Sequence, residues 1–316
     1  MSKTFEKLQP YLDKAMALMT ARSLFEWDIQ TTAPFGAADY TSKVNGIISD
    51  EYMKSLINDD VRQLLKKLQE PDEQAELTST EKAIVKELVK TYEQLESIPP
   101  EEYREFNELT SKSSRAWAKA KKDNCYADFA PYLKKIIDFK KRFASYRAKD
   151  GKSPYEVLLG DFEECFMIKD LDAFFDKVKA EIIPLLKEVY KKSDTIDKSF
   201  NYLKYDIAKQ KEFCKYLAGY LGFDFNRGVI AESEHPFTLQ LHNHDVRITD
   251  RYVEDNLESA IFSIIHETGH ALYEMNIDDS ITQTPVGTGA SMGMHESQSR
   301  FYENLLGRSY DFWEPI

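Results

Sequence analysis

Two histidines stand four residues apart in the run Ile264-Ile265-His266-Glu267-Thr268-Gly269-His270-Ala271-Leu272. Apolar residues flank the pair and continue upstream at helical spacing, so we expect a buried helix here. Because four residues make about one helical turn, both imidazoles project from a single face and can reach one metal ion. The H-E-x-x-H pattern is typical of the metal-binding helix of zinc peptidases.

Glu267 points beside the metal-facing side of this helix, a position that suits a general base acting on a metal-activated water. Gly269 costs the helix about 1 kcal/mol, which indicates that another segment approaches this turn closely. The alternative is a helix that merely carries two ordinary histidines. Clustering argues against it, because all six histidines follow residue 234: His235, His242, His244, His266, His270 and His295.

A mononuclear site needs a third protein ligand and one open position for water. We expect Glu296, on the next helical segment, to be that ligand. Arg300 and Glu303 follow it at i+4 and i+7 on the same stripe, where they can orient the ligands. His295 would point about 100° around this helix, away from the ion, and is the fallback ligand.

The rest of the chain is expected to be mainly helical. Glycine and proline are scarce, at 12 and 11 of 316 residues. Thr78 and Glu81 form a capping box for a helix that ends before Pro99-Pro100. Further helices are predicted at about 101, 127–148 and 171–192, the last kinked or restarted at Pro184. Aromatic residues such as Phe174, Phe175 and Phe213 are expected in the helical core.

Short runs with period-two alternation lie between residues 228 and 249, around His242-Asn243-His244. They predict a hairpin or a three-stranded sheet. The predicted fold class is therefore mainly α, a long-helix, gluzincin-like metallopeptidase architecture with a small β-sheet beside the metal-binding helix. We expect one unit over 1–316, with a helical lobe over 1–222 and the sheet and metal-binding helices over 223–316.

The composition of the chain argues against some classes of binding partner. The net charge of −12 repels nucleic acid and anionic membranes. No apolar run approaches the roughly 20 residues of a membrane span, and no secretory signal opens the chain. Cys125, Cys165 and Cys214 are in no metal-ligand spacing and are predicted to be free thiols. We expect a cytoplasmic location.

Five ordered stretches resemble the M32 metallocarboxypeptidases, the carboxypeptidase Taq family. They are Trp27-Asp28-Ile29-Gln30-Thr31 with Pro34, His235-Pro236-Phe237, Asp245-Val246-Arg247-Ile248-Thr249, His266-Glu267-Thr268-Gly269-His270 and His295-Glu296-Ser297-Gln298-Ser299-Arg300. The ordered set is far more specific than any one motif, and it spans most of the chain.

The resemblance implies a mostly helical protein with a deep cleft, which releases single amino acids from peptide C-termini. It implies zinc or cobalt as the metal and a homodimer as the assembly. The family's metal ligands match His266, His270 and Glu296, and its general base or acid matches Glu267. The family's later Gly-x-x-Gln-Asp-x-His-Trp stretch is not present in this sequence, so we expect a truncated form that lacks the C-terminal part of the domain.

Two weaker candidates lie by the predicted sheet. His235 and Arg247 could contact a peptide substrate that pairs as an added strand. The structural alternative for Arg247 is an ion pair with Asp245. Rival functions are an endo-acting or dipeptide-releasing helical metallopeptidase, and a non-catalytic binding protein with a metal-stabilised scaffold. The residues alone do not choose among zinc, cobalt and manganese.

Overall fold

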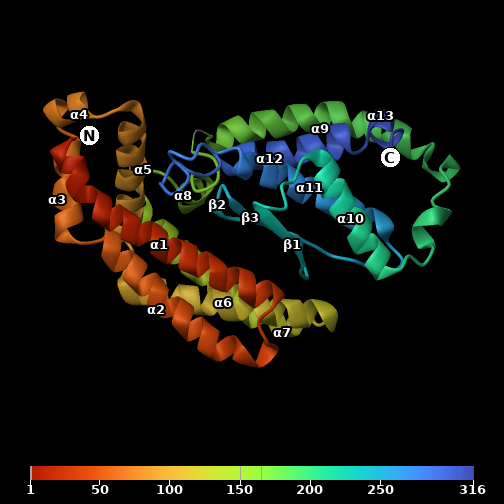
Figure 1. Cartoon of the computed structure of the whole chain (residues 1–316), viewed down its shortest axis with the longest axis horizontal. Helices are drawn as coiled ribbons and strands as arrows, with labels where there is room; N and C mark the ends of the chain where they lie inside the picture. The colour runs from red at the N-terminus through yellow and green to blue at the C-terminus, as the bar shows by residue number, and fades with distance from the viewer. Residues whose placement is uncertain (1, 150, 165) are drawn as a thin grey trace.

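The computed structural model describes residues 2–149, 151–164 and 166–316, and within them the chain is mostly helical with one small sheet (Figure 1). The expected mainly α fold class is confirmed. The helices are α1 (Lys3–Thr31), α2 (Ala38–Leu56), α3 (Asp59–Leu68), α4 (Pro71–Glu76), α5 (Ser79–Glu96), α6 (Pro100–Lys122), α7 (Tyr126–Arg147), α8 (Pro154–Leu159), α9 (Ile168–Tyr190), α10 (Ile207–Leu221), α11 (Leu257–Met275), α12 (Met292–Arg300), the π-helical turn η4 (Phe301–Leu306) and α13 (Tyr310–Trp313).

Local sequence fixes the start of α5 as predicted. The Glu81 backbone N–H donates to the Thr78 hydroxyl at 3.2 Å, and the Thr78 N–H donates to the Glu81 carboxylate at 2.8 Å. This capping box satisfies two N–H groups that the helix leaves unpaired. The apolar stripe of α5 is buried in a first core formed with α1, α2 and α3; among its buried members are Leu8, Leu12, Leu68 and Leu88.

The sheet has three strands: β1 (Gly228–Glu232), β2 (Thr238–His242) and β3 (Asp245–Asp250). The strand order is β1-β3-β2, with β1 parallel to β3 and β2 antiparallel to it. The three-stranded alternative of the sequence prediction is therefore confirmed. The central strand β3 is the most buried, because α11 packs on it: Val246 and Ile248 are both fully buried.

A second core joins the sheet to α10 and α11. Its fully buried members include Leu217 of α10, Ile248 of β3 and Ile264 of α11. Helix α10, which precedes the predicted lobe boundary at 222, contributes to the same core as the sheet; the boundary itself stays a prediction. Val286, from the loop before α12, packs against the first core instead. The loop thus connects the two cores, and the single unit over 1–316 stays a prediction.

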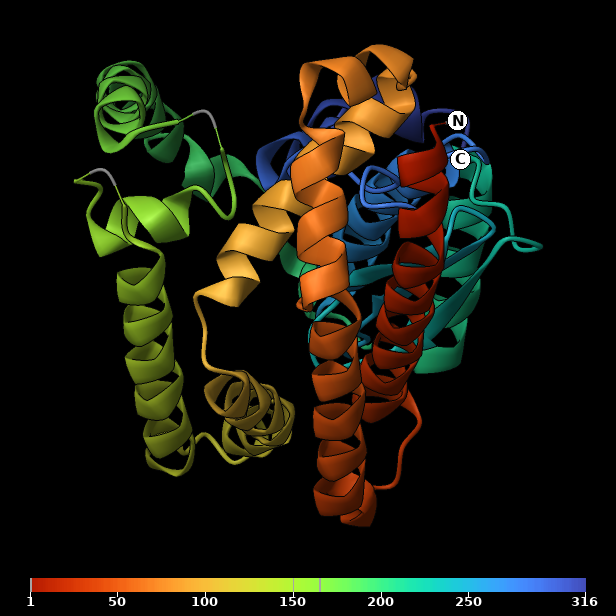
Figure 2. The same ribbon diagram turned by 90° about the vertical axis from the view of Figure 1, so that its left-hand side faces the viewer.

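Helix α9 differs from its prediction. It runs through Pro184 as one helix, without a restart, and none of its 23 residues, all of them described, is buried. Phe174 and Phe175 are 59% and 49% exposed, so their placement in the core was wrong. Helical spacing predicts which residues share a face but not what covers that face. Figure 2 shows α7, α8 and α9 to one side of the other helices.

Two remaining sequence predictions are tested by the fold. Cys125 and the buried Cys214 are free thiols, as predicted, and Cys165 lies outside the described residues. Among the helices of the described ranges, none combines the length and the apolar composition that crossing a membrane would require. Trp27, at the end of α1, is buried, and its ring meets that of Phe237 edge to face at 5.7 Å.

Candidate metal centre

Helix α11 carries the H-E-x-x-H motif through the second core. The Asn256 side chain caps its start by accepting a hydrogen bond from the Ser259 N–H at 3.2 Å. Gly269 explains why α12 can lie so close: a Cβ at this position would be 2.8 Å from Ser299 Cα and 3.0 Å from the Gln298 carbonyl oxygen. The close approach that Gly269 indicated is therefore confirmed, and it brings α12 against the histidine face of α11.

His266, His270 and Glu296 form a group able to hold a metal ion. Glu296 Oε2 lies 3.5 Å from His266 Nε2 and 3.3 Å from His270 Nε2. Two ligands at about 2.1 Å from one tetrahedral zinc ion are about 3.4 Å apart, so this donor set fits a metal closely. Both histidine side chains are mostly buried, whereas that of Glu296 is 44% exposed, which leaves the site open to water on one side.

The charge states of these ligands also suit a metal. Burial, with the neighbouring rings of His295 and His266, lowers the pKa of His270 to about 4, so its imidazole is neutral. Burial by itself would raise the pKa of Glu296, but the hydrogen bond from Arg300 and the charge of His266 outweigh it and hold that pKa below its ordinary value. A neutral imidazole and an ionised carboxylate are the forms that bind a cation.

Glu267 lies beside the ligand group and is 6% exposed. Its Oε2 accepts a hydrogen bond from the Thr238 hydroxyl at 2.6 Å. Burial raises the pKa of Glu267, and the Thr238 hydrogen bond opposes that rise. The sequence analysis missed Thr238, because only the packing of β2 on α11 brings the two side chains together.

The other ligand residues are held by side chains from α12 and η4. Glu303 Oε2 lies 2.9 Å from His266 Nδ1, which fixes the ring with Nε2 toward Glu296. Arg300 donates to Glu296 Oε1 at 2.7 Å and to Glu303 Oε2 at 3.2 Å, in the arrangement expected of that stripe. Arg308 donates to Glu303 Oε1 at 2.8 Å, a contact that the sequence analysis missed.

His295 lies outside the group able to hold a metal but contacts one of its members, His270. Its Nδ1 lies 2.5 Å from His270 Nδ1, on the side of that ring opposite the ligand atom. The geometric reason is that α12 crosses α11 at Gly269, so the residue before Glu296 meets the α11 face one turn further along. Within the described residues, His295 is not a member of the ligand group.

Cavities lie on both sides of the ligand group. One, of about 630 Å³, extends toward Phe262 and Arg308, and another, of about 660 Å³, toward Phe162 and Met292. His266, Glu267 and Glu296 line both of them.

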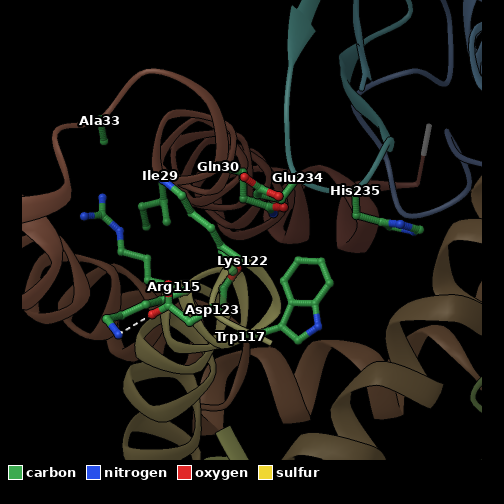
Figure 3. Close-up of a pocket in the computed structure, with 12 residues that line it drawn as sticks. Ile29, Gln30, Ala33, Arg115, Trp117, Lys122, Asp123, Glu234 and His235 are labelled. Carbon is green, nitrogen blue, oxygen red and sulfur yellow. Dashed lines mark hydrogen bonds and ion pairs between the residues drawn. The ribbon is translucent and has the colours of Figure 1, made fainter. Parts of the chain in front are cut away.

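His235 lines both of these cavities and also a third, of about 500 Å³, between α1 and α6. Figure 3 shows this third cavity, with Trp117 of α6 and the exposed His235 together at one side. The two rings meet edge to face at 6.4 Å. The candidate substrate residue His235 therefore stands where the three cavities adjoin.

Arg247 forms an ion pair with Asp245, the structural role considered for it as the alternative to substrate binding. Its Nε and a terminal nitrogen donate to the two Asp245 oxygens at 2.8 and 2.9 Å. Its guanidinium also lies 5.6 Å from the Trp27 ring centre. The described residues that line the two cavities beside the ligand group do not include Arg247, and a substrate contact for it stays a prediction.

The fold and the site define the class of mostly helical metallopeptidases: an H-E-x-x-H helix packed on a small sheet, with a glutamate on the following helix placed where it could bind the same metal. Within that class the chain belongs to the Carboxypeptidase Taq (M32) metallopeptidase family, which it matches over residues 7–316. The family implies a divalent metal.

Named relatives agree with this assignment. Carboxypeptidase 1 of Bacillus subtilis (strain 168) is 40% identical over 295 residues, which cover 93% of this chain and 58% of the relative. Thermostable carboxypeptidase 1 of Pyrococcus furiosus is 31% identical over 317 residues, covering 100% of this chain and 63% of the relative. This chain thus spans about three fifths of the length of these relatives.

Solved structures have the same fold. A crystal structure of BsuCP superposes with a TM-score of 0.95 at 37% identity, covering 100% of this chain and 63% of that one. The M32 carboxypeptidase from Deinococcus radiodurans R1 gives a TM-score of 0.86 at 29% identity, covering 99% of this chain and 62% of that one.

Proposed function

We propose that the protein is a metal-dependent carboxypeptidase that releases single amino acids from peptide C-termini. The observation that carries the proposal is the spacing of His266, His270 and Glu296 beside the buried carboxylate of Glu267. Membership of the M32 family and the carboxypeptidase names of its relatives support the exo-acting reaction.

The donor set favours zinc, with cobalt as the alternative. Two imidazole nitrogens and one carboxylate oxygen are a common protein ligand set of catalytic zinc, and cobalt accepts the same donors. When bound, such a metal polarises a carbonyl group and lowers the pKa of water toward 7.

Glu267 is proposed to act as the general base and then as the acid that protonates the leaving amine. Its burial raises its pKa, which suits a carboxylate that must hold a proton during the reaction. The Thr238 hydroxyl holds this carboxylate in place. We assign His235 to the peptide substrate, because it lines both cavities at the ligand group, and Arg247 to a weaker contact through β3.

Arg300 and Glu303 are proposed to position the ligands. Each hydrogen-bonds a ligand side chain, Arg300 to Glu296 and Glu303 to His266. Partners of this kind fix the orientation of a metal ligand and raise its basicity.

We further propose peptide partners, a cytoplasmic location and a homodimer. Free thiols at Cys125 and Cys214 support a reducing compartment. The exposed apolar residues of α9 supply a surface on which a second copy could pack.

A C-terminal ladder assay tests the reaction. Incubation with zinc and a short peptide should remove one residue at a time from the C-terminus, detected by mass spectrometry. Internal cleavage or release of dipeptides would instead identify an endo-acting or dipeptidyl metallopeptidase. If a chelator lowers only the melting temperature and no hydrolysis occurs with metal present, the metal supports a non-catalytic binding protein.

Replacing Glu267 by Gln tests the assigned base. The variant should keep its metal content and lose most of its activity, because the amide cannot accept the proton. Glu212→Gln, an exposed position on α10, is the matched control and should behave as wild type. Retained turnover in Glu267→Gln would defeat the assignment.

A further inference from the structure

His295 lies between a proposed metal ligand and a buried acid. Its Nδ1 is 2.5 Å from His270 Nδ1, and its Nε2 is 2.5 Å from Glu274 Oε1. Glu274 follows His270 by four residues on α11, so both face α12. The three side chains form a continuous line that starts at the ligand group and ends in the interior of the protein.

Metal binding fixes the position of every proton on this line. His270 Nε2 faces Glu296, so it needs a lone pair for the metal, and the ring proton must be on Nδ1. His295 Nδ1 must then accept that proton's hydrogen bond, which places the His295 proton on Nε2. That N–H in turn donates to the Glu274 carboxylate. Each ring nitrogen of the two histidines then has one hydrogen-bonding or metal-binding role.

We propose that Glu274 and His295 are positioning residues for the metal: the Glu274–His295 pair selects the His270 tautomer that presents Nε2 to the ion. The proposal rests on the proposed metal site. His266 has the direct form of the same arrangement, with Glu303 on its Nδ1 at 2.9 Å. A carboxylate on the far nitrogen orients a ligand histidine and raises its basicity. At His270 the corresponding carboxylate is that of Glu274, and the imidazole of His295 lies between the two.

The surroundings hold the His295 ring in this role. The Tyr273 ring meets it edge to face at 5.3 Å. A Cβ at Gly289 would lie 2.6 Å from His295 Cδ2, so glycine leaves the space that the ring occupies. The ring is therefore packed on its carbon side while both nitrogens are hydrogen-bonded.

The burial of Glu274 points to function more than to stability. Its side chain is 5% exposed, and its Oε1 meets His295 Nε2. Among the described residues, Glu274 Oε2 has no hydrogen-bond partner, and the side chain lines a cavity of about 410 Å³ between α1 and β2. An acid in such surroundings costs folding free energy. Its carboxylate stands at the end of a line of contacts that leads to a proposed metal ligand.

Metal affinity measured on the full chain tests the proposal without reference to catalysis. We expect Glu274→Gln and His295→Phe each to weaken Zn²⁺ and Co²⁺ binding by about 10–100-fold, measured by competition with a chelator. The Co²⁺ absorption spectrum should change as well, because the His270 ring loses its fixed orientation. Glu212→Gln and the surface variant His244→Asn are the controls and should match wild type.

A double variant separates this role from an ordinary structural contact. Because both residues act through the single contact at His270, Glu274→Gln with His295→Phe should cost no more affinity than either change alone. It also leaves no unpaired charge behind, so it should fold. Wild-type affinity and an unchanged Co²⁺ spectrum in folded variants would overturn the proposal, as would additive losses. A wild-type chain that binds neither metal overturns it together with the metal site, whereas metal binding without peptide hydrolysis overturns only the carboxypeptidase function.

Discussion

The Thr238 hydroxyl donates a hydrogen bond of 2.6 Å to the carboxylate of Glu267. A hydrogen bond from a neutral donor to a charged group contributes about 1.5–3 kcal/mol. Thr238→Val keeps the shape of the side chain and removes the donor. We expect kcat to fall by about ten- to a hundredfold, since each 1.36 kcal/mol corresponds to a factor of ten.

Thr238→Ser is the matched control, because it keeps the hydroxyl, and it should retain most of the activity. Metal content measured alongside should be unchanged in both variants. A Thr238→Val protein with normal kcat would show that Glu267 is positioned by other contacts.

Asp250 is another buried carboxylate, and it belongs to no proposed catalytic step. It is fully buried at the end of β3, where its carboxylate accepts a hydrogen bond from the Arg251 N–H at 2.8 Å. Burial raises the pKa of Asp250 to about 7, although hydrogen bonds from Cys214 and Tyr252 oppose the rise. The folded protein therefore keeps this group protonated at pH values where the unfolded chain has lost the proton.

The pH dependence of stability follows from that difference. With a folded pKa of about 7 above an unfolded value of about 4, the contribution of Asp250 is fully present below pH 4 and is lost as pH rises to about 7. The slope in this window is about −1.4 kcal/mol per pH unit. Asp250→Asn should abolish it, so its stability relative to wild type should rise by about 2–3 kcal/mol between pH 5 and pH 8.

Urea unfolding of the metal-free proteins at pH 5, 6, 7 and 8 measures this relative stability. Asp250 also raises the pKa of Cys214 and of Tyr252, but burial keeps both groups protonated throughout this pH range, so the difference between the two proteins reports on Asp250. Parallel curves across the whole range would contradict the raised pKa.

At the residue scale, spacing predicted what lies on one helix. His266 and His270 on α11, and Arg300 beside Glu296 on α12, follow from counting turns. Thr238 and Arg308 could not be predicted, because each contact depends on how separate elements pack. The contact of His295 with His270 was not predicted for the same reason: counting around α12 gives the direction of His295 from that helix but not the position of α11.

At the scale of elements, the crossing of α11 and α12 depends on Gly269. Gly269→Ala would improve helix propensity by about 1 kcal/mol in an isolated helix. Here the new methyl would meet the backbone of α12 at 2.8 Å, and a backbone cannot rotate aside. We expect a net destabilisation of about 1–3 kcal/mol and weaker metal binding, because Glu296 is carried away with α12.

Thermal unfolding and a zinc titration of Gly269→Ala check both effects. Gly160→Ala is the control: at this position a Cβ would have only ordinary contacts, 3.5 Å from the Glu156 and Val157 carbonyl oxygens. Equal behaviour of the two variants would show that α12 can move without cost to the site.

Helices and strands that follow from local sequence patterns were predicted correctly, whereas features that depend on distant contacts were not. The capping box at Thr78 and the alternating strands around β3 are local patterns, and both are confirmed. Pro184 did not end α9, because a proline removes one hydrogen bond while the turns on either side keep theirs. The parallel pairing of β1 with β3 depends on contacts distant in sequence, and alternation does not encode it.

At the scale of the whole molecule, the exposed face of α9 is the main departure from an ordinary soluble surface. Its exposed apolar side chains are Phe174, Phe175, Val178, Ile182, Ile183, Leu185, Leu186, Val189 and Tyr190. An apolar patch of this extent favours association. We expect concentration-dependent self-association, which Leu185→Lys with Val189→Lys should reduce.

Light scattering coupled to gel filtration measures the mass at several concentrations. Asp172→Lys is a charge-matched control, because it also adds two positive charges to α9 but leaves the apolar residues in place. If the control reduces association as strongly as the double variant, net charge and not the apolar face controls the assembly.

The end of the first helix, α1, lies next to the strand that holds the proposed base, Glu267. Trp27, near the end of α1, rests on Phe237, and the next residue, Thr238, holds Glu267. Helix α1 therefore packs against the residue that directly precedes the hydrogen-bond donor to Glu267. We therefore expect changes in the packing of α1, more than two hundred residues before Glu267 in sequence, to alter the position of the proposed base.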